Sequence, residues 1–392
     1  MSAFDGTNGP TLKIQFYFGS TWTNVPVTDL REVSITRGRT RADQKFDAGT
    51  MTIVLDNRSG DYDPDNLSGP WVTGGVSALR DGLRGRFVAT WSGTSYTLYD
   101  GYMETPSLDA GFDATATITF TDAMAKFAKA NAPALKAASY SGETTATRVG
   151  RMLTYAGWPT GSSYRSISGS VTLTKTTQDA PITDIIDTCV AAEAGSFYVS
   201  RTGVATFLNL SHKFSRPTQL LFDDQRSTNT VEYNSLKTTP GTLQVVNYAT
   251  VSYGINGKKQ FQKTVQSSSS ITKYGYKKVA VETPIFLAKV AAKLAQYLAY
   301  KDAKPTTTVS EINFTALALG TLYPDFLETE LQDQVSVQRK TVDGRQLGTL
   351  NSSTGKYSMN LVVEGMDHKI SADDWQVTYF TSPMNPYRVT LP

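Results

Sequence analysis

The side chains that most often act as nucleophiles or metal ligands are scarce in this sequence. Its 392 residues include one cysteine, Cys189, and two histidines, His212 and His368. A zinc site built of nitrogen and sulfur ligands would need nearly all of them, and a single cysteine forms no internal disulfide. The composition therefore disfavours a cysteine or zinc hydrolase. We expect no enzymatic activity, and no catalytic, cofactor-binding or metal-binding residue.

Cys189 and His368 each have a structural interpretation that we favour over a catalytic one. Cys189 falls on the apolar stripe of an expected helix, where a thiol behaves as a small hydrophobic side chain. Asp367 precedes His368, but adjacency in sequence does not supply the geometry of a catalytic triad, and no GxSxG motif is present. We expect residues 366–369 to form a surface turn between the last strands.

Residues 56–66 are dense in side-chain oxygen atoms, which calcium prefers as ligands. Counted from Asp61, however, the sixth residue is Asn66 where an EF-hand has glycine, and the twelfth is Val72 where it has glutamate. We favour a series of Asx-turns with Pro64 fixing the bend. A bound calcium ion is the alternative that the sequence leaves open.

Three arginines, Arg37, Arg39 and Arg41, alternate along one stretch. In an extended chain their side chains would point the same way. The formal net charge is only +3, which argues against stable binding to nucleic acid or to a membrane surface. We interpret the row as a solvated barrel face or as a candidate subunit contact that forms salt bridges with a neighbouring chain.

The positions of these residues depend on elements that the sequence predicts in blocks. Residues 11–122 read as short strands, since apolar Ala114, Ala116, Ile118 and Phe120 alternate with threonine, and a closed or nearly closed antiparallel barrel would hide their edges. Helices follow at 144–157 and from Pro181 to Gly195, with a hairpin at 197–207, which together indicate a small α+β domain. Strands resume from about residue 231.

A second mixed region lies further along the chain. The serine run 267–270 looks like a linker or loop tip, and a helix is expected to start at Thr283 and Pro284 and to stop before Pro305. Strands are then expected at 307–314, 334–339, 359–364 and 376–379.

An ordered series of short blocks gives the sequence a resemblance to a known family. The blocks are VSITRGR (33–39), FDAGT (46–50), VLDNR (54–58), YDPDN (62–66), YDGY (99–102), YAGWP (155–159), EAGSFY (193–198), VEYN (231–234) and VEGMDH (363–368). In this order they resemble minor tail proteins of long-tailed bacteriophages, especially those that infect actinobacteria. The family is the tail hub family, related to the baseplate hub of contractile tails and to the N-terminal part of tail-associated lysins.

The resemblance implies a mainly β fold with an α+β insert, in which two tube-like β-barrel domains carry smaller accessory domains. On this basis we expect a first barrel at 1–125, an α+β accessory domain at 126–217, a second barrel at 218–270 and 330–392, and an inserted accessory domain at 271–329. No appended hydrolase domain is expected, unlike in the lysin branch.

The resemblance also implies a function. Three subunits would form a ring at the distal tail tip of the virion, after synthesis in the host cytoplasm, and would present six barrels to the sixfold distal tail ring. Expected partners are that ring, the C-terminus of the tape-measure protein, other minor tail proteins and DNA in transit through a gated channel. The alternatives are the distal tail ring itself, a receptor- or carbohydrate-binding tip protein or, less favoured, a cell-wall hydrolase.

Overall fold

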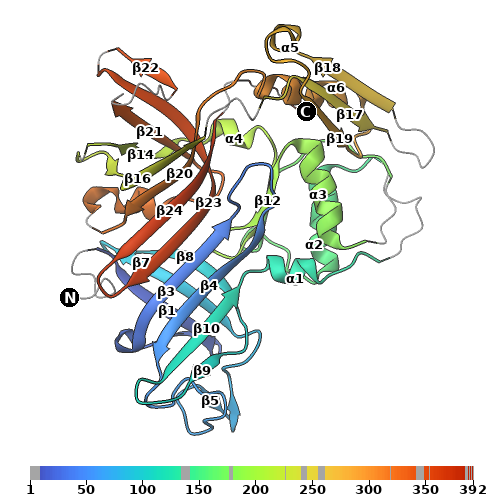
Figure 1. Cartoon of the computed structure of the whole chain (residues 1–392). Coiled ribbons are helices and arrows are strands. Elements are labelled where there is room, and N and C mark those ends of the chain that lie inside the picture. The colour runs from blue at the N-terminus through green and yellow to red at the C-terminus, as the bar shows by residue number, and fades with distance from the viewer. Residues whose placement is uncertain are drawn as a thin grey trace.

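The computed structural model describes residues 9–133, 142–175, 180–225, 227–239, 245–254, 261–317, 319–340, 348–352, 354–384, 387, 389 and 391. Most of them lie in strands, and the helices are concentrated on one side of the molecule (Figure 1). This arrangement confirms the expected mainly β fold with an α+β insert. Within the described ranges, no helix combines the length and the apolar character needed to cross a membrane.

The first strand-rich half is an antiparallel sheet with the order β3-β4-β10-β8-β7-β1-β2. Its apolar side chains alternate with polar ones, as in β10, where Ala116, Ile118 and Phe120 are buried between partly exposed threonines. The strands are β1 (Thr11–Phe18), β2 (Thr21–Asn24), β3 (Leu30–Gly38), β4 (Asp47–Asp56), β7 (Arg84–Trp91), β8 (Thr94–Met103) and β10 (Thr115–Thr121), with the short β5 (Val72–Thr73), β6 (Val76–Ser77) and β9 (Ser107–Asp109) beside them.

The second strand-rich half comes mainly from the C-terminal part of the chain. Its longest strand, β23, pairs with β21, β22 and β24. On the other side of β24 lies β20, which pairs in turn with β16. The strands are β14 (Thr218–Asp223), β15 (Val231–Glu232), β16 (Ser235–Thr239), β20 (Thr308–Thr315), β21 (Gln334–Lys340), β22 (Thr349–Asn351), β23 (Lys356–Ser371) and β24 (Trp375–Pro383). The short helix α7 (Tyr323–Glu328) packs on this half through buried Phe326 and Leu327.

The two halves are not separate sheets, because β23 and β3 pair antiparallel with Ile35 opposite His368. The result is one sixteen-stranded sheet with one shared hydrophobic core. Among the described strands, the strand pairings do not return to close a ring in either half.

The helical side holds a second core. It contains α1 (Met124–Ala128), α2 (Thr145–Tyr155), α3 (Ile182–Glu193), the short α4 (His212–Ser215) and the small sheet of β11 (Arg165–Ile167), β12 (Ser196–Val199) and β13 (Ala205–Leu208). The helices and the hairpin lie where the sequence predicts them. Gly157 takes a left-handed φ of 68° just after α2, as expected, whereas the C-cap of α3 is Ala194, with φ 47°, rather than Gly195.

A further unit packs on the same core. The sheet β18-β17-β19 is made of β17 (Tyr248–Tyr253), β18 (Phe261–Gln266) and β19 (Lys278–Glu282), and the helices α5 (Ser268–Tyr274) and α6 (Ala288–Lys301) complete it. β17 therefore pairs with β19 and not with the second strand-rich half, which differs from the expected grouping of 218–270. The exact domain boundaries stay predictions.

Two local expectations in this unit are wrong. The serine run does not form a linker, because Ser268 to Ser270 open α5 and Ser270 Oγ donates a 2.6 Å hydrogen bond to the Ala303 carbonyl. The last long helix begins at Ala288 and not at Thr283, because Thr283 and Ile285 are held in extended backbone by bonds to Ser252 and Leu173.

Candidate assembly interface

The structure does not present the three arginines as one exposed row. β3 ends at Gly38, where a positive φ of 89° and a bulge break the alternation of side chains. Arg37 is buried, and its guanidinium lies 2.6 Å from Glu330 Oε1 and 3.1 Å from the Val199 carbonyl. The expectation of a common direction is corrected accordingly, because a buried guanidinium is stabilised by partners within its own chain.

Arg39 also forms its ion pair within its own chain. It lies 2.6 Å from Glu364 Oε2 and its guanidinium stacks over the ring of Phe46 at 4.3 Å from the centroid. Glu364 is fully buried, and it also accepts hydrogen bonds from Gln332 and Ser382. Although burial opposes ionisation, nearby Arg39 and Lys213 hold the pKa of Glu364 below its usual range.

Arg41 differs from the other two because it is exposed, and among the described residues its guanidinium forms an ion pair with exposed Asp43 alone, at 2.7 Å. Such an exposed pair is worth little to stability. Arg41 alone of the three remains accessible to another chain, and a role for it in a subunit contact stays a prediction.

Glu330 links three parts of the fold that are distant in sequence. It accepts from Arg37 on β3 and from the backbone N–H of Arg201, which lies in the turn between β12 and β13. Arg201 in turn donates to the carbonyls of Thr97 and Leu327. We call Arg37, Arg39, Arg201, Glu330 and Glu364 the junction cluster. It joins the first half, the α+β region and the second half into one body.

Sequence reasoning missed the acidic members of this cluster. Glu364 interrupts an otherwise apolar stretch of β23, where the register shifts between Val363 and Gly365. A lone acidic residue within an apolar strand is the signal that could have identified Glu364, but its arginine partner lies 325 residues away in the chain.

A second candidate surface is the polar face of the large sheet. In the pairing register, one row crosses six strands from β20 to β10, and a second row lies two residues further along. The rows are Asn313, Thr378, Asp367, Thr36, Thr50 and Thr121, and Thr315, Gln376, Lys369, Ser34, Thr52 and Thr119. All twelve side chains are partly or fully exposed, whereas Ile35 and Met51 between the two rows are buried.

This face is rich in hydroxyls and nearly balanced in charge. Asn313 donates to Thr378 at 3.0 Å, and Thr52 and Thr119 lie 3.4 Å apart, so neighbouring strands are linked by side chains as well as by backbone. Asp367 and Lys369 contribute one charge of each sign, and a cavity opens around them and Gln376. The face therefore crosses from one strand-rich half to the other without interruption.

The potential nucleophile and bases are placed in packed surroundings. Cys189 is fully buried on α3, and burial raises its pKa to about 12. His368 is not in a surface turn, which corrects that expectation: it lies within β23, is buried, and accepts a hydrogen bond from the Trp375 indole at 3.2 Å. Its pKa is lowered to about 3, chiefly by burial. Asp367 projects to the opposite face of the strand.

The acidic segment 56–66 forms the expected Asx-turns. Asp56 Oδ1 accepts from the N–H of Arg58 at 3.1 Å, and Asp63 Oδ1 accepts from that of Asp65 at 2.8 Å. In the ranges that the structure describes, no group of three or more His, Cys, Asp or Glu side chains is placed to hold a metal ion.

Comparisons with known proteins identify the fold. No protein family model and no curated protein sequence matches this chain. Among solved structures, a tail protein from Neisseria meningitidis has a TM-score of 0.60 at 11% identity and covers 95% of both chains. The 43 kDa tail protein of a Shewanella oneidensis prophage has a TM-score of 0.59 at 10% identity, covering 95% of this chain and 98% of that one. A Listeria monocytogenes prophage tail protein has a TM-score of 0.51 at 10% identity, over 94% of both chains.

These likenesses extend over nearly the whole chain and define its class. The protein has the fold of bacteriophage tail proteins, with two strand-rich halves and helical accessory regions. The identities are too low to transfer a function with the fold.

Proposed function

We propose that this chain is a structural protein of a bacteriophage tail tip, a hub of the type found in long-tailed actinobacteriophages, without enzymatic activity. Three copies form a ring in which two strand-rich halves per copy supply six positions. The ring matches the sixfold distal tail ring above it to a threefold tip below it. It also holds the tape-measure C-terminus and other minor tail proteins, and it gates the channel for genome ejection.

The observation that carries this proposal is the continuous polar face of the sheet. The solvated face of an antiparallel sheet is polar in most soluble proteins, but here the polar rows continue through the β3–β23 pairing across both strand-rich halves. A channel wall needs a continuous hydrated surface of this kind. Nucleic acid binds to proteins mainly through cations that neutralise its phosphates. A wall of hydroxyls with balanced charges lets DNA pass without stable binding.

The symmetry of the ring follows from the two halves. Because each chain contributes two strand-rich halves, three chains supply six such halves, one for each subunit of the sixfold ring above. Contacts in a closed ring of three are heterologous, so one surface of a copy meets a different surface of the next.

Copy number in the assembled particle tests this proposal. Particles labelled through a tag on this chain and imaged by electron microscopy should carry the label at the distal tip, and native mass spectrometry of isolated tips should give three copies. Six copies would instead identify the distal tail ring. Label away from the tail, or absent from particles, would contradict a tail function altogether.

A further inference from the structure

The turn between β9 and β10 carries a phenyl ring that the chain itself does not cover. Phe112 is 99% exposed, and Leu108 in the adjoining strand β9 is also exposed. Asp113 is held by Arg31 at 2.6 Å. Asp109 accepts a hydrogen bond from Thr115 at 3.2 Å, but no cation pairs with it among the described residues. The turn therefore presents one bare aromatic ring and one uncompensated carboxylate.

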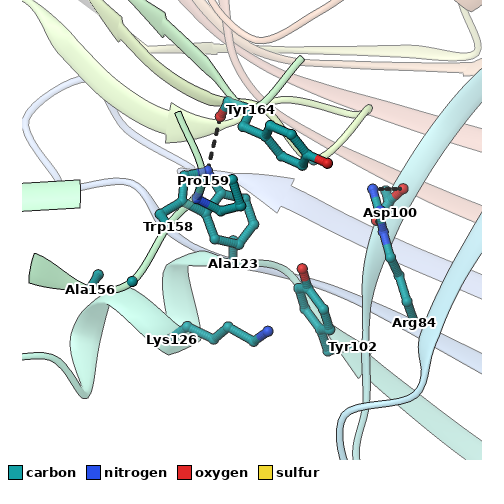
Figure 2. A pocket seen from close by; sticks show the side chains of 11 residues that line it. Arg84, Asp100, Tyr102, Ala123, Lys126, Ala156, Trp158, Pro159 and Tyr164 are labelled. Carbon is teal, nitrogen blue, oxygen red and sulfur yellow. Dashed lines mark hydrogen bonds and ion pairs between the residues drawn. The ribbon is translucent and has the colours of Figure 1, made fainter. Parts of the chain in front are cut away.

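A cleft of about 270 Å³ lies between the first strand-rich half and the α+β region (Figure 2). Three aromatic rings line it, Tyr102 from β8 on one side and Trp158 and Tyr164 on the other, beside Pro159. Ala123 and Ala156 leave space between them. An engineered cavity of about 150 Å³ already binds benzene, so this cleft is large enough for a phenyl ring with a neighbouring group.

The cleft also holds a cation without a counter-ion. Arg84 and Asp100 neutralise each other at 2.8 Å. Lys126 of α1 extends over the Tyr102 ring, 3.3 Å from its centroid, and no carboxylate pairs with it in the described part of the chain (Figure 2). The cleft is thus complementary to the turn, because it has an aromatic pocket for the Phe112 ring and one positive charge, on Lys126, for the Asp109 carboxylate.

The turn cannot reach the cleft of its own chain. It precedes Thr115 at the start of β10, whereas Ala123 and Lys126 follow Thr121 at the end of the same strand. Seven residues of strand at about 3.3 Å each hold the two features roughly 23 Å apart. β10 is paired with β4 along its whole length, so it does not bend back.

We propose that the Phe112 turn of one copy docks in this cleft of a second copy, with the phenyl ring between Tyr102 and Trp158 and with Asp109 facing Lys126. The contact joins two different surfaces of the same chain, so it is heterologous, and a rotation of one third of a turn between copies closes it into the proposed ring of three. It rests on the proposed function, for which it supplies the subunit contact.

Site-directed cross-linking tests the contact directly. One batch of protein carries Phe112→Cys and a second, differently tagged batch carries Ala156→Cys, while native Cys189 is buried. After mixing and mild oxidation, we expect a disulfide that joins the two tags. The matched control replaces Phe112→Cys by Phe286→Cys, another exposed phenylalanine, and should give no such product. Absence of the Phe112–Ala156 cross-link, or equal yield in the control, would overturn the proposal.

Charge reversal provides an independent measurement. Lys126→Glu and Asp109→Lys should each weaken self-association, measured by sedimentation velocity, by about tenfold or more, and mixing the two variants should restore part of it by creating a reversed pair. Phe112→Ala should weaken association similarly and Phe286→Ala should not. If three copies are found in particles but these variants associate like the wild type, the inference fails and the proposed function stands. If the contact forms but particles lack the protein, the proposed function fails alone.

Discussion

Glu364 and Asp43 each pair with an arginine, one in the interior of the protein and the other at its surface. Glu364 is fully buried between Arg39, Gln332 and Ser382, whereas Asp43 forms an exposed pair with Arg41. Removing one partner of a buried pair leaves an uncompensated charge, which costs far more than the loss of an exposed pair. The two acids therefore make a matched test of the junction cluster.

We predict that Glu364→Gln lowers the free energy of unfolding by about 3–5 kcal/mol, since Arg39 and Lys213 lose their buried counter-charge. Asp43→Asn should change it by less than about 1 kcal/mol. Urea denaturation followed by fluorescence measures both. Equal effects of the two substitutions would show that the junction cluster does not stabilise the fold.

His368 provides a prediction on pH dependence. Burial favours its neutral form, with nearby Arg37 adding to the effect, and lowers its pKa from 6.5 to about 3. Between these values the unfolded chain binds a proton that the folded chain does not, so the contribution of His368 to stability falls as pH drops from 6.5 toward 3. His368→Gln, which retains a hydrogen-bond acceptor for Trp375, should show a shallower loss of stability over this interval. An identical slope in both proteins would contradict the buried neutral imidazole.

At the scale of the element, α3 depends on its apolar stripe and on its C-cap. Ile182, Ile185, Ile186 and Cys189 face the second core, while Asp184 is exposed. The helix ends with Ala194 in the left-handed region, where a side chain is disfavoured and glycine is not. A substitution that relieves the C-cap should therefore raise the free energy of unfolding, and one that places a charge on the stripe should lower it.

We expect Ala194→Gly to raise the free energy of unfolding by about 0.5–1 kcal/mol, because glycine adopts the left-handed C-cap without strain. The same change at Ala191, inside the helix, should lower it by about 1 kcal/mol. Thermal denaturation of both variants measures this pair. Destabilisation by Ala194→Gly would show that the residue does not adopt this conformation.

Ile186→Asp tests the stripe itself. An unpaired carboxylate in the second core should cost several kcal/mol and unfold the helical side, whereas Thr183→Asp, in the first turn of the same helix, should be nearly neutral because a carboxylate suits that helix end. Circular dichroism recorded during heating measures the melting temperatures of the two variants. An unchanged melting curve for Ile186→Asp would mean that this stripe is not buried.

At the scale of the whole molecule, the large sheet, the two cores and the junction cluster make one body whose polar face and exposed Phe112 turn point outward. Nothing in the placement of Cys189 or His368 provides an activated nucleophile, since burial suppresses the thiolate and leaves the imidazole enclosed.

We therefore predict that the purified protein releases no soluble fragments from peptidoglycan over prolonged incubation. A purified phage lysin serves as the positive control. Sustained release that is abolished by His368→Ala would overturn the non-enzymatic assignment.

The sequence determined the local elements well, for reasons that are themselves local. The period-two alternation in β10, the stripe of α3 and the hairpin of β12 and β13 follow from side-chain spacing within a few residues. The Asx-turns at 56–66 follow likewise from short-range hydrogen bonds between neighbouring residues.

Only the tertiary structure decided what depends on residues far apart in the chain. The arginine row was expected to face outward, but the bulge at Gly38 and the distant acids Glu330 and Glu364 turned two of its members into internal contacts. His368 was expected in a turn because its polar neighbours suggest one, yet pairing of β23 with β3 and β24 buries it. Strand partners are chosen by the fit of whole faces, and that information is not contained in any short stretch of sequence.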